Sequence, residues 1–182
     1  GTKSKETVIK YTFQDINFLL KQNVKMIVIA CNTASACSLK IIKEHYHLPI
    51  VEVVEPGSRA AAAATANGKI GVIGTSATVA SGVYEHAVKS ILPDCDFYAK
   101  ACPMFVPLVE EGWWDNTISK SIASEYLSDM RRSGVDTLVL GCTHYPLLKS
   151  SIKKVIGKKI KIIDSATAVA TAVKNLLTKN NM

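Results

Sequence analysis

The 182-residue sequence lacks several features that mark specialised classes of protein. No apolar run approaches the roughly 20 residues that cross a membrane, and the opening residues GTKSKETVIK contain no apolar stretch of the signal-peptide kind. The five cysteines are an odd number and include no C-x-x-C pair, which argues against a disulfide framework or a zinc ribbon. These absences predict a reduced, cytoplasmic protein that is not embedded in a membrane.

Apolar residues make up 48% of the sequence, enough for one core or for two small lobes that share a cleft. The formal net charge of +7 raises the question of a nucleic-acid partner. The lysines are spread out, however, apart from KKVIGKKIK at 153–161, which has the pattern of a polar helix face running into a strand. We therefore expect a solvated basic surface and no nucleic-acid partner.

Apolar runs and helical patterns alternate along the whole chain. Strands are expected at 24–30, 50–54, 69–75, 96–103, 135–142 and 159–164. Helices are expected at 4–22, 31–46, 58–66, 76–92, 117–133, 146–156 and 165–179. This order is typical of an α/β fold built from βα units around a parallel sheet. The run VKMIVIA at 24–30 shows little polar alternation, which predicts a strand buried on both faces.

The two halves of the chain resemble each other. NVKMIVIACNT (23–33) aligns with GVDTLVLGCTH (134–144), which pairs Cys31 with Cys142 at an offset of 142 − 31 = 111 residues. VVEPGSRAAAAA (53–64) aligns with IIDSATAVATAV (162–173) at an offset of 162 − 53 = 109. Unrelated βα units also look alike, but the matched cysteines favour a duplication. We therefore expect two similar lobes related by pseudo-symmetry.

Each of the two paired cysteines lies at the carboxyl end of a predicted strand. In open α/β sheets, ligands bind beyond the carboxyl ends of the strands. The free N–H groups of a helix start also favour an anion there and lower the pKa of a thiol. We therefore expect Cys31 and Cys142 to face a ligand and to form reactive thiolates easily.

Four roles are possible for this pair of cysteines: a zinc site, a Cys-His dyad, buried structural thiols, or two-sided proton transfer. The spacing of the two cysteines and His144 is no standard zinc set, and Cys142 with His144 makes a weak dyad because sequence neighbours usually point to different faces. Buried structural thiols would leave the symmetry unexplained. Two thiols on opposite faces of a carbon centre suit a reaction that removes a proton from one face and returns one to the other.

The motifs VIACNTASA (28–36) and LVLGCTHYPLL (138–148) resemble the two signatures of the glutamate racemases. VVEPGSRAA (53–61), IGVIGTSATVASGVYEHA (70–87), ACPMFVPLVEEG (101–112) and IDSATAVA (163–170) also resemble this family, over essentially the whole chain. The resemblance implies a cofactor-independent, metal-free isomerase that interconverts L- and D-glutamate and supplies D-glutamate for peptidoglycan.

The resemblance also implies roles for particular residues. Cys31 and Cys142 are the expected acid and base, and His144 and Glu110 are expected to assist Cys142. The implied substrate contacts are Gly1, Asn32, Thr33, Thr75, Thr78, Thr143 and His144. Simpler alternatives exist, since Thr75 and Thr78 could only cap a helix, and the choice of Glu110 over Glu111 rests on the motif alone.

The sequence departs from the family pattern at its start. The family opens with DSG-x-GG and reaches a PYG motif about forty residues later, whereas Gly1 here matches the glycine of PYG. We therefore expect a fragment of a racemase that is weakly active or inactive by itself. In the family pattern, the acid that would support Cys31 belongs to the N-terminal segment with DSG-x-GG.

These observations combine into one expectation for the fold and the function. We expect a first α/β lobe from 1–54 plus 165–182, a second from 55–164, and the active site in the cleft between them. The alternatives are a related thiol-based racemase or decarboxylase, or a non-catalytic module that binds an amino acid or a partner. Glutamate is the expected small-molecule partner, and the family often forms homodimers.

Overall fold

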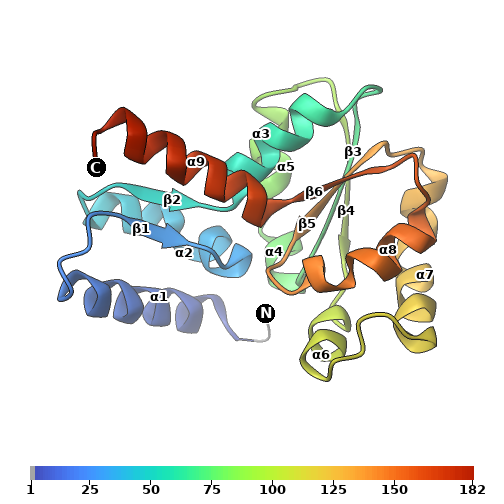
Figure 1. Cartoon of the computed structure of the whole chain (residues 1–182), viewed down its shortest axis with the longest axis horizontal. Helices are drawn as coiled ribbons and strands as arrows, with labels where there is room; N and C mark the ends of the chain where they lie inside the picture. Colours follow the sequence, from blue (N-terminus) through green and yellow to red (C-terminus); the bar gives the residue numbers. More distant parts are fainter. Residues whose placement is uncertain (1–2) are drawn as a thin grey trace.

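The structure is a computed structural model that describes residues 3–182, and within this range one or two helices separate each strand from the next (Figure 1). The strands are β1 (Ile27–Ile29), β2 (Ile50–Glu52), β3 (Lys69–Gly74), β4 (Asp96–Ala101), β5 (Thr137–Gly141) and β6 (Lys161–Asp164). The α-helices are α1 (Lys5–Leu20), α2 (Asn32–His45), α3 (Val54–Ala64), α4 (Ser76–Ala80), α5 (Val83–Lys89), α6 (Phe105–Glu110), α7 (Thr117–Arg132), α8 (Lys149–Ile156) and α9 (Ser165–Lys179). A short 3₁₀ helix, η1 (Tyr145–Leu148), precedes α8.

All the strand pairs are parallel, and they form two separate sheets. β1 pairs with β2, while the larger sheet has the order β4-β3-β5-β6. Parallel neighbours need crossover connections, which the intervening helices supply. The predicted α/β class with parallel sheets is therefore confirmed.

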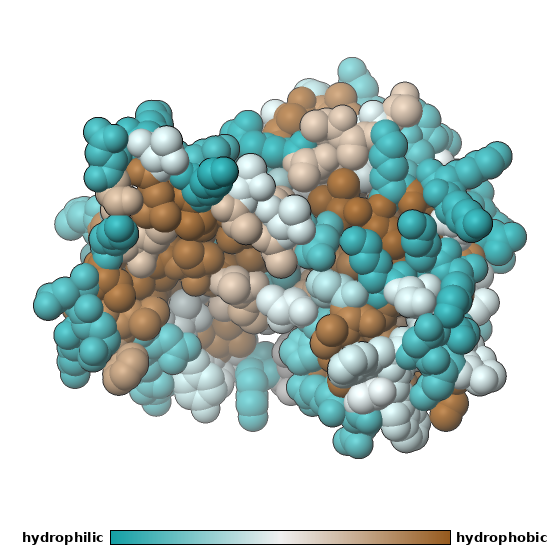
Figure 2. Space-filling view, viewed as in Figure 1, coloured by the Kyte–Doolittle hydropathy of each residue, from teal (hydrophilic) through white to brown (hydrophobic). Residues whose placement is uncertain are grey.

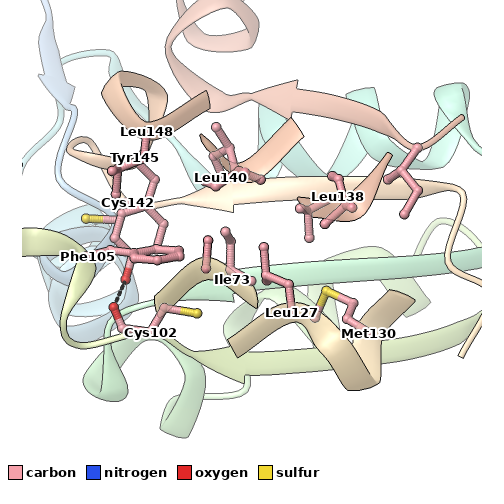
Figure 3. Close-up of a cluster of buried hydrophobic side chains, with 14 of the residues drawn as sticks. Ile73, Cys102, Phe105, Leu127, Met130, Leu138, Leu140, Cys142, Tyr145 and Leu148 are labelled. Atoms are coloured by element: carbon pink, nitrogen blue, oxygen red, sulfur yellow. Dashed lines mark hydrogen bonds between the residues drawn. The ribbon is translucent and has the colours of Figure 1, made fainter. Parts of the chain in front are cut away.

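Helices cover both faces of the larger sheet, and β5 shows why. Leu138 and Leu140 belong to a core that includes residues of α6, α7 and α8. Val139, between them, belongs to a second core that includes residues of α3, α5 and α9. Because successive side chains of a strand point to opposite faces, a strand buried on both faces is apolar throughout. Figure 3 shows the first of these cores, with Cys142 at its edge beside Tyr145.

The prediction that β1 is buried on both faces is wrong in this structure. Ile27 and Ile29 pack with residues of α1 and α2, but Val28 between them is 41% exposed. The reason is that α9 packs on β2, and the outer face of β1 instead borders a cavity of about 310 Å³. Figure 2 shows apolar surface in this part of the molecule. Within residues 3–182, no helix has both the length and the apolar composition for a membrane span.

Gly141, the last residue of β5, lies where no side chain fits. A methyl group added there would lie 2.8 Å from the carbonyl oxygen of Ile73 on β3 and 3.2 Å from Cε2 of Tyr84. The backbone of β3 cannot yield without disturbing the sheet. A glycine at this point therefore lets the chain reach Cys142 in close contact with the neighbouring strand and with α5.

The Gly141→Ala substitution is expected to lower the free energy of unfolding by about 1–3 kcal/mol, the usual cost of overpacking a core. Gly57→Ala on α3 is the matched control, because its methyl group would make only an ordinary contact of 3.6 Å with the Tyr84 hydroxyl. Urea denaturation of the two variants checks the difference. Equal stabilities would contradict the close fit at Gly141.

Candidate active site

Cys31 lies where β1 ends and α2 begins. Its Sγ accepts a hydrogen bond from the backbone N–H of Ala34 at 3.5 Å, so the thiol is the N-cap of α2. The side chain is exposed. The prediction that this cysteine follows a strand and opens a helix is confirmed, and the position gives its sulfur both solvent access and a helix start.

Cys142 directly follows β5 and is only 6% exposed. Burial is the main cause that raises the pKa of its thiol, although the backbone N–H groups of His144 and Tyr145 act in the opposite direction. A negative charge on Cys31 raises the pKa further. The prediction of a lowered thiol pKa is therefore wrong for Cys142, because the chain enters the short η1 there and desolvation outweighs the backbone dipoles.

Burial should also control how the thiols react with iodoacetamide. We expect Cys31 to be alkylated first at pH 7, and Cys142 to react slowly until the pH rises far enough to ionise it. Cys102 is an internal control, because burial raises its pKa to about 12 and it should stay unmodified. Peptide mapping by mass spectrometry measures all three. Faster alkylation of Cys142 than of Cys31 at pH 7 would contradict the described burial.

His144 and Glu110 extend from Cys142 in a chain of three groups. Nδ1 of His144 lies 3.9 Å from the Sγ of Cys142, and Nε2 lies 3.3 Å from Oε1 of Glu110 at the end of α6. The expectation that Cys142 and His144 point to different faces is wrong, because a turn at Thr143 replaces the extended strand and brings the ring back to the sulfur. The structure thus places the carboxylate of Glu110 on the far side of the imidazole from the thiol.

Three threonine hydroxyls join α2 to the loop after β3. Oγ1 of Thr33 lies 3.0 Å from Oγ1 of Thr75 and 3.2 Å from that of Thr78, and the latter two are 3.0 Å apart. All three residues are buried. Thr75 also accepts a hydrogen bond from the N–H of Thr78 and is the N-cap of α4. The alternative that Thr75 caps a helix is therefore confirmed, and the same hydroxyl also contacts Thr33.

Asn32, next to Cys31, is 2% exposed, and its Oδ1 accepts a hydrogen bond of 2.6 Å from the Tyr84 hydroxyl. Its Nδ2 is buried and has no hydrogen-bond partner among the described residues. Tyr84 was not among the residues predicted from the sequence. The only local signal is its place among the apolar residues of α5, which predicts a core position and nothing about Asn32.

Thr143 and Gly1 are the two remaining predicted substrate contacts. Thr143 is exposed and lines the cavity of about 310 Å³ together with Ala30, so the neighbours of both cysteines border one space. Gly1 lies outside the described residues. No group of three or more His, Cys, Asp or Glu side chains in the range 3–182 is arranged to hold a metal ion.

The fold and the site together define a parallel α/β protein with a pair of cysteines at strand ends, one from each sheet. The chain belongs to the Asp/Glu/hydantoin racemase family, whose model matches residues 2–173. A glutamate racemase from Geobacter metallireducens is 50% identical over 177 residues, which are 97% of this chain and 66% of that relative. The chain thus spans just under two thirds of the length of this curated relative.

Solved structures agree with the family assignment. A glutamate racemase isoform from Bacillus anthracis has a TM-score of 0.95 and 37% identity, with 98% of this chain and 67% of that chain covered. A glutamate racemase from Francisella tularensis in complex with D-glutamate has a TM-score of 0.92 and 35% identity, with 99% of this chain and 67% of that chain covered. The resemblance seen in the two cysteine motifs is therefore confirmed.

Proposed function

We propose that the protein is a cofactor-independent glutamate racemase that interconverts L- and D-glutamate by proton transfer between Cys31 and Cys142. The observation that carries the proposal is that each cysteine lies at the carboxyl end of a strand, one in each parallel sheet. The structural similarity to a glutamate racemase in complex with D-glutamate supports the choice of substrate. Supply of D-glutamate for peptidoglycan is part of the same proposal.

The proposed reaction needs one thiolate and one thiol at a time. The thiolate takes the α-proton of the substrate, which leaves a carbanion, and the opposite thiol gives its proton to the other face of the carbon. The first sulfur ends protonated and the second ends as thiolate, so protons and charge balance. The electrostatic effect of Cys31 on Cys142 supports this alternation, because a negative charge on one disfavours a negative charge on the other.

The buried Cys142 needs a base to become a thiolate near neutral pH. We propose that Glu110 accepts a hydrogen bond from the Nε2–H of His144, which keeps the proton on Nε2 and leaves Nδ1 without a proton and facing the sulfur. His144 then removes the proton from Cys142 and, as the family resemblance implies, Cys142 takes the α-proton from L-glutamate. Cys31, which is exposed and caps a helix, takes the α-proton from D-glutamate in the reverse direction.

Hydrogen-bond donors must stabilise the substrate carboxylate as negative charge builds up beside it. The unpaired Nδ2 of Asn32 and the hydroxyls of Thr33, Thr75 and Thr78 are the donors proposed for this task. Thr143, at the border of the cavity, is proposed as a further substrate contact. In this assignment the substrate lies between α2 and the strand ends of the larger sheet.

The proposal also covers organisation and location. We propose two lobes, 1–54 with 165–182 and 55–164, each built on one of the two sheets, with the substrate in the cleft between them. Homodimer formation and a cytoplasmic location are proposed from the family resemblance. Analytical sedimentation of the purified protein tests the proposed homodimer.

A substrate panel tests the proposed activity. Glutamate, aspartate and malonates are incubated with the protein, and chiral chromatography follows inversion or loss of CO₂. Inversion of glutamate alone is the expected result, at the low rate expected of a fragment. Inversion of aspartate would favour a related racemase, loss of CO₂ a decarboxylase, and glutamate binding without turnover a non-catalytic module.

A further inference from the structure

Tyr84 lies between the two cysteine segments, and its hydroxyl bonds to Asn32 and to neither sulfur. The side chain comes from α5 and is 3% exposed. Its ring lies against Gly141, the residue before Cys142, since a methyl group added there would lie 3.2 Å from Cε2. At the other end, its hydroxyl reaches Asn32, the residue after Cys31. One buried phenol thus contacts a neighbour of each cysteine.

The Tyr84 hydroxyl is a hydrogen-bond donor to Asn32. Burial is the main cause that raises the pKa of this phenol far above its ordinary value, and the nearby Glu52 and Cys142 add to the effect. The hydroxyl therefore keeps its proton throughout the pH range in which proteins are folded. Its bond to Oδ1 of Asn32 is 2.6 Å long, and no second acceptor for it is recorded among the described residues.

This bond determines which end of the Asn32 amide is occupied. Oδ1 is held by Tyr84, and Nδ2 is left buried without a partner within residues 3–182. The reverse orientation would leave both Oδ1 and the phenolic proton unpaired, which costs more than one unpaired amide group. A buried, unpaired donor beside Cys31 is complementary to an anionic oxygen of a ligand, such as a carboxylate.

We propose that Tyr84 is a positioning residue that holds the Asn32 amide with Nδ2 directed to the substrate carboxylate. This inference rests on the proposed racemase function and deepens it. The Tyr84 hydroxyl bonds to neither sulfur and, in this proposal, does not touch the reacting carbon. It orients the donor beside Cys31 while its ring supports the strand end that carries Cys142.

The test compares Tyr84→Phe with Tyr46→Phe in the whole protein. Tyr46 is a matched control because its hydroxyl also donates to an asparagine oxygen, Oδ1 of Asn17, at 2.8 Å, but the pair is exposed and joins α1 to the end of α2. We expect Tyr84→Phe to lower kcat/KM for glutamate about tenfold, as for loss of one hydrogen bond that orients a charged group. Tyr46→Phe should keep the unmodified value, and circular dichroism should show both variants folded.

A double-mutant cycle separates positioning from a purely structural role. If Tyr84 acts through Asn32, then Tyr84→Phe should cause no further loss in an Asn32→Ala background. Asn32→Asp should be worse than Asn32→Ala, because it keeps an acceptor for Tyr84 but puts a negative charge in place of the donor. Losses that multiply in the double variant, or an unchanged kcat/KM for Tyr84→Phe, would overturn the proposal.

The two proposals fail in distinguishable ways. If the unmodified chain inverts no amino acid, which is the result expected of an inactive fragment, the proposed activity fails for this chain, and the role of Tyr84 is then measured by calorimetry with D-glutamate. Weaker binding to Tyr84→Phe than to Tyr46→Phe would still support positioning. Equal affinities, or no binding to any form, would overturn it.

Discussion

Replacing either Cys31 or Cys142 by serine is expected to lower kcat/KM for glutamate racemisation by about 10²–10⁴-fold, the usual contribution of a general acid or base. An alcohol is a far weaker acid than a thiol, so serine can neither hold the negative charge nor deliver its proton readily. L- and D-glutamate have equal free energies, so kcat/KM must fall by the same factor in both directions. Chiral chromatography started from each enantiomer measures the loss.

The two serine variants should differ in proton exchange. Cys142→Ser keeps Cys31 and should exchange the α-proton of D-glutamate with solvent, whereas Cys31→Ser should exchange only that of L-glutamate. Cys37→Ser is the control, since Cys37 lies on α2 outside the proposed site, and it should keep normal turnover. A serine variant that racemises at the normal rate would remove that cysteine from the mechanism.

His144→Ala is expected to cause the second large loss, about 10²-fold or more in kcat/KM at pH 7. Burial raises the pKa of Cys142, so at pH 7 its thiol is the dominant form and needs the base at Nδ1. Raising the pH ionises the thiol without help. The defect of His144→Ala should therefore shrink steadily between pH 7 and pH 10, which a pH profile of kcat/KM in this variant measures.

Glu110→Gln and Glu111→Gln form a matched pair for the same site. Of the two glutamates, Glu110 contacts the imidazole, at 3.3 Å, and its side chain is 62% exposed, so a moderate loss of about tenfold is expected for Glu110→Gln. Glu111→Gln should have little effect. A defect in His144→Ala that is independent of pH, or equal effects of the two glutamine variants, would contradict this arrangement.

The strands of the larger sheet and both cysteine positions could be predicted because they depend on local sequence. A strand such as β5, buried on both faces, needs a continuous apolar run, and that run is visible in residues 138–140. The repeat then pairs Cys142 with Cys31 by register alone. The start of the first helix, expected at residue 4, is also local, because the side chain of Ser4 accepts from the N–H of Thr7 as the N-cap of α1.

The other features depend on packing between distant segments. The exposure of Val28 depends on where α9 lies, and the raised pKa of Cys142 depends on the core that surrounds it. The bond from Tyr84 to Asn32 joins residues 52 positions apart, and nothing in the α5 pattern indicates it. Motifs locate reactive groups, but desolvation and hydrogen-bond partners follow from tertiary structure.

The most direct test of two opposed thiols is a short reaction of L-glutamate in D₂O. In D₂O both cysteines carry deuterium when protonated, so the thiol that reprotonates the carbanion delivers deuterium. Transfer between two different sulfurs predicts that all D-glutamate formed at early times carries deuterium at Cα, while unreacted L-glutamate keeps its proton. D-glutamate that retains the original proton would show that a single base returned it, and would contradict the account.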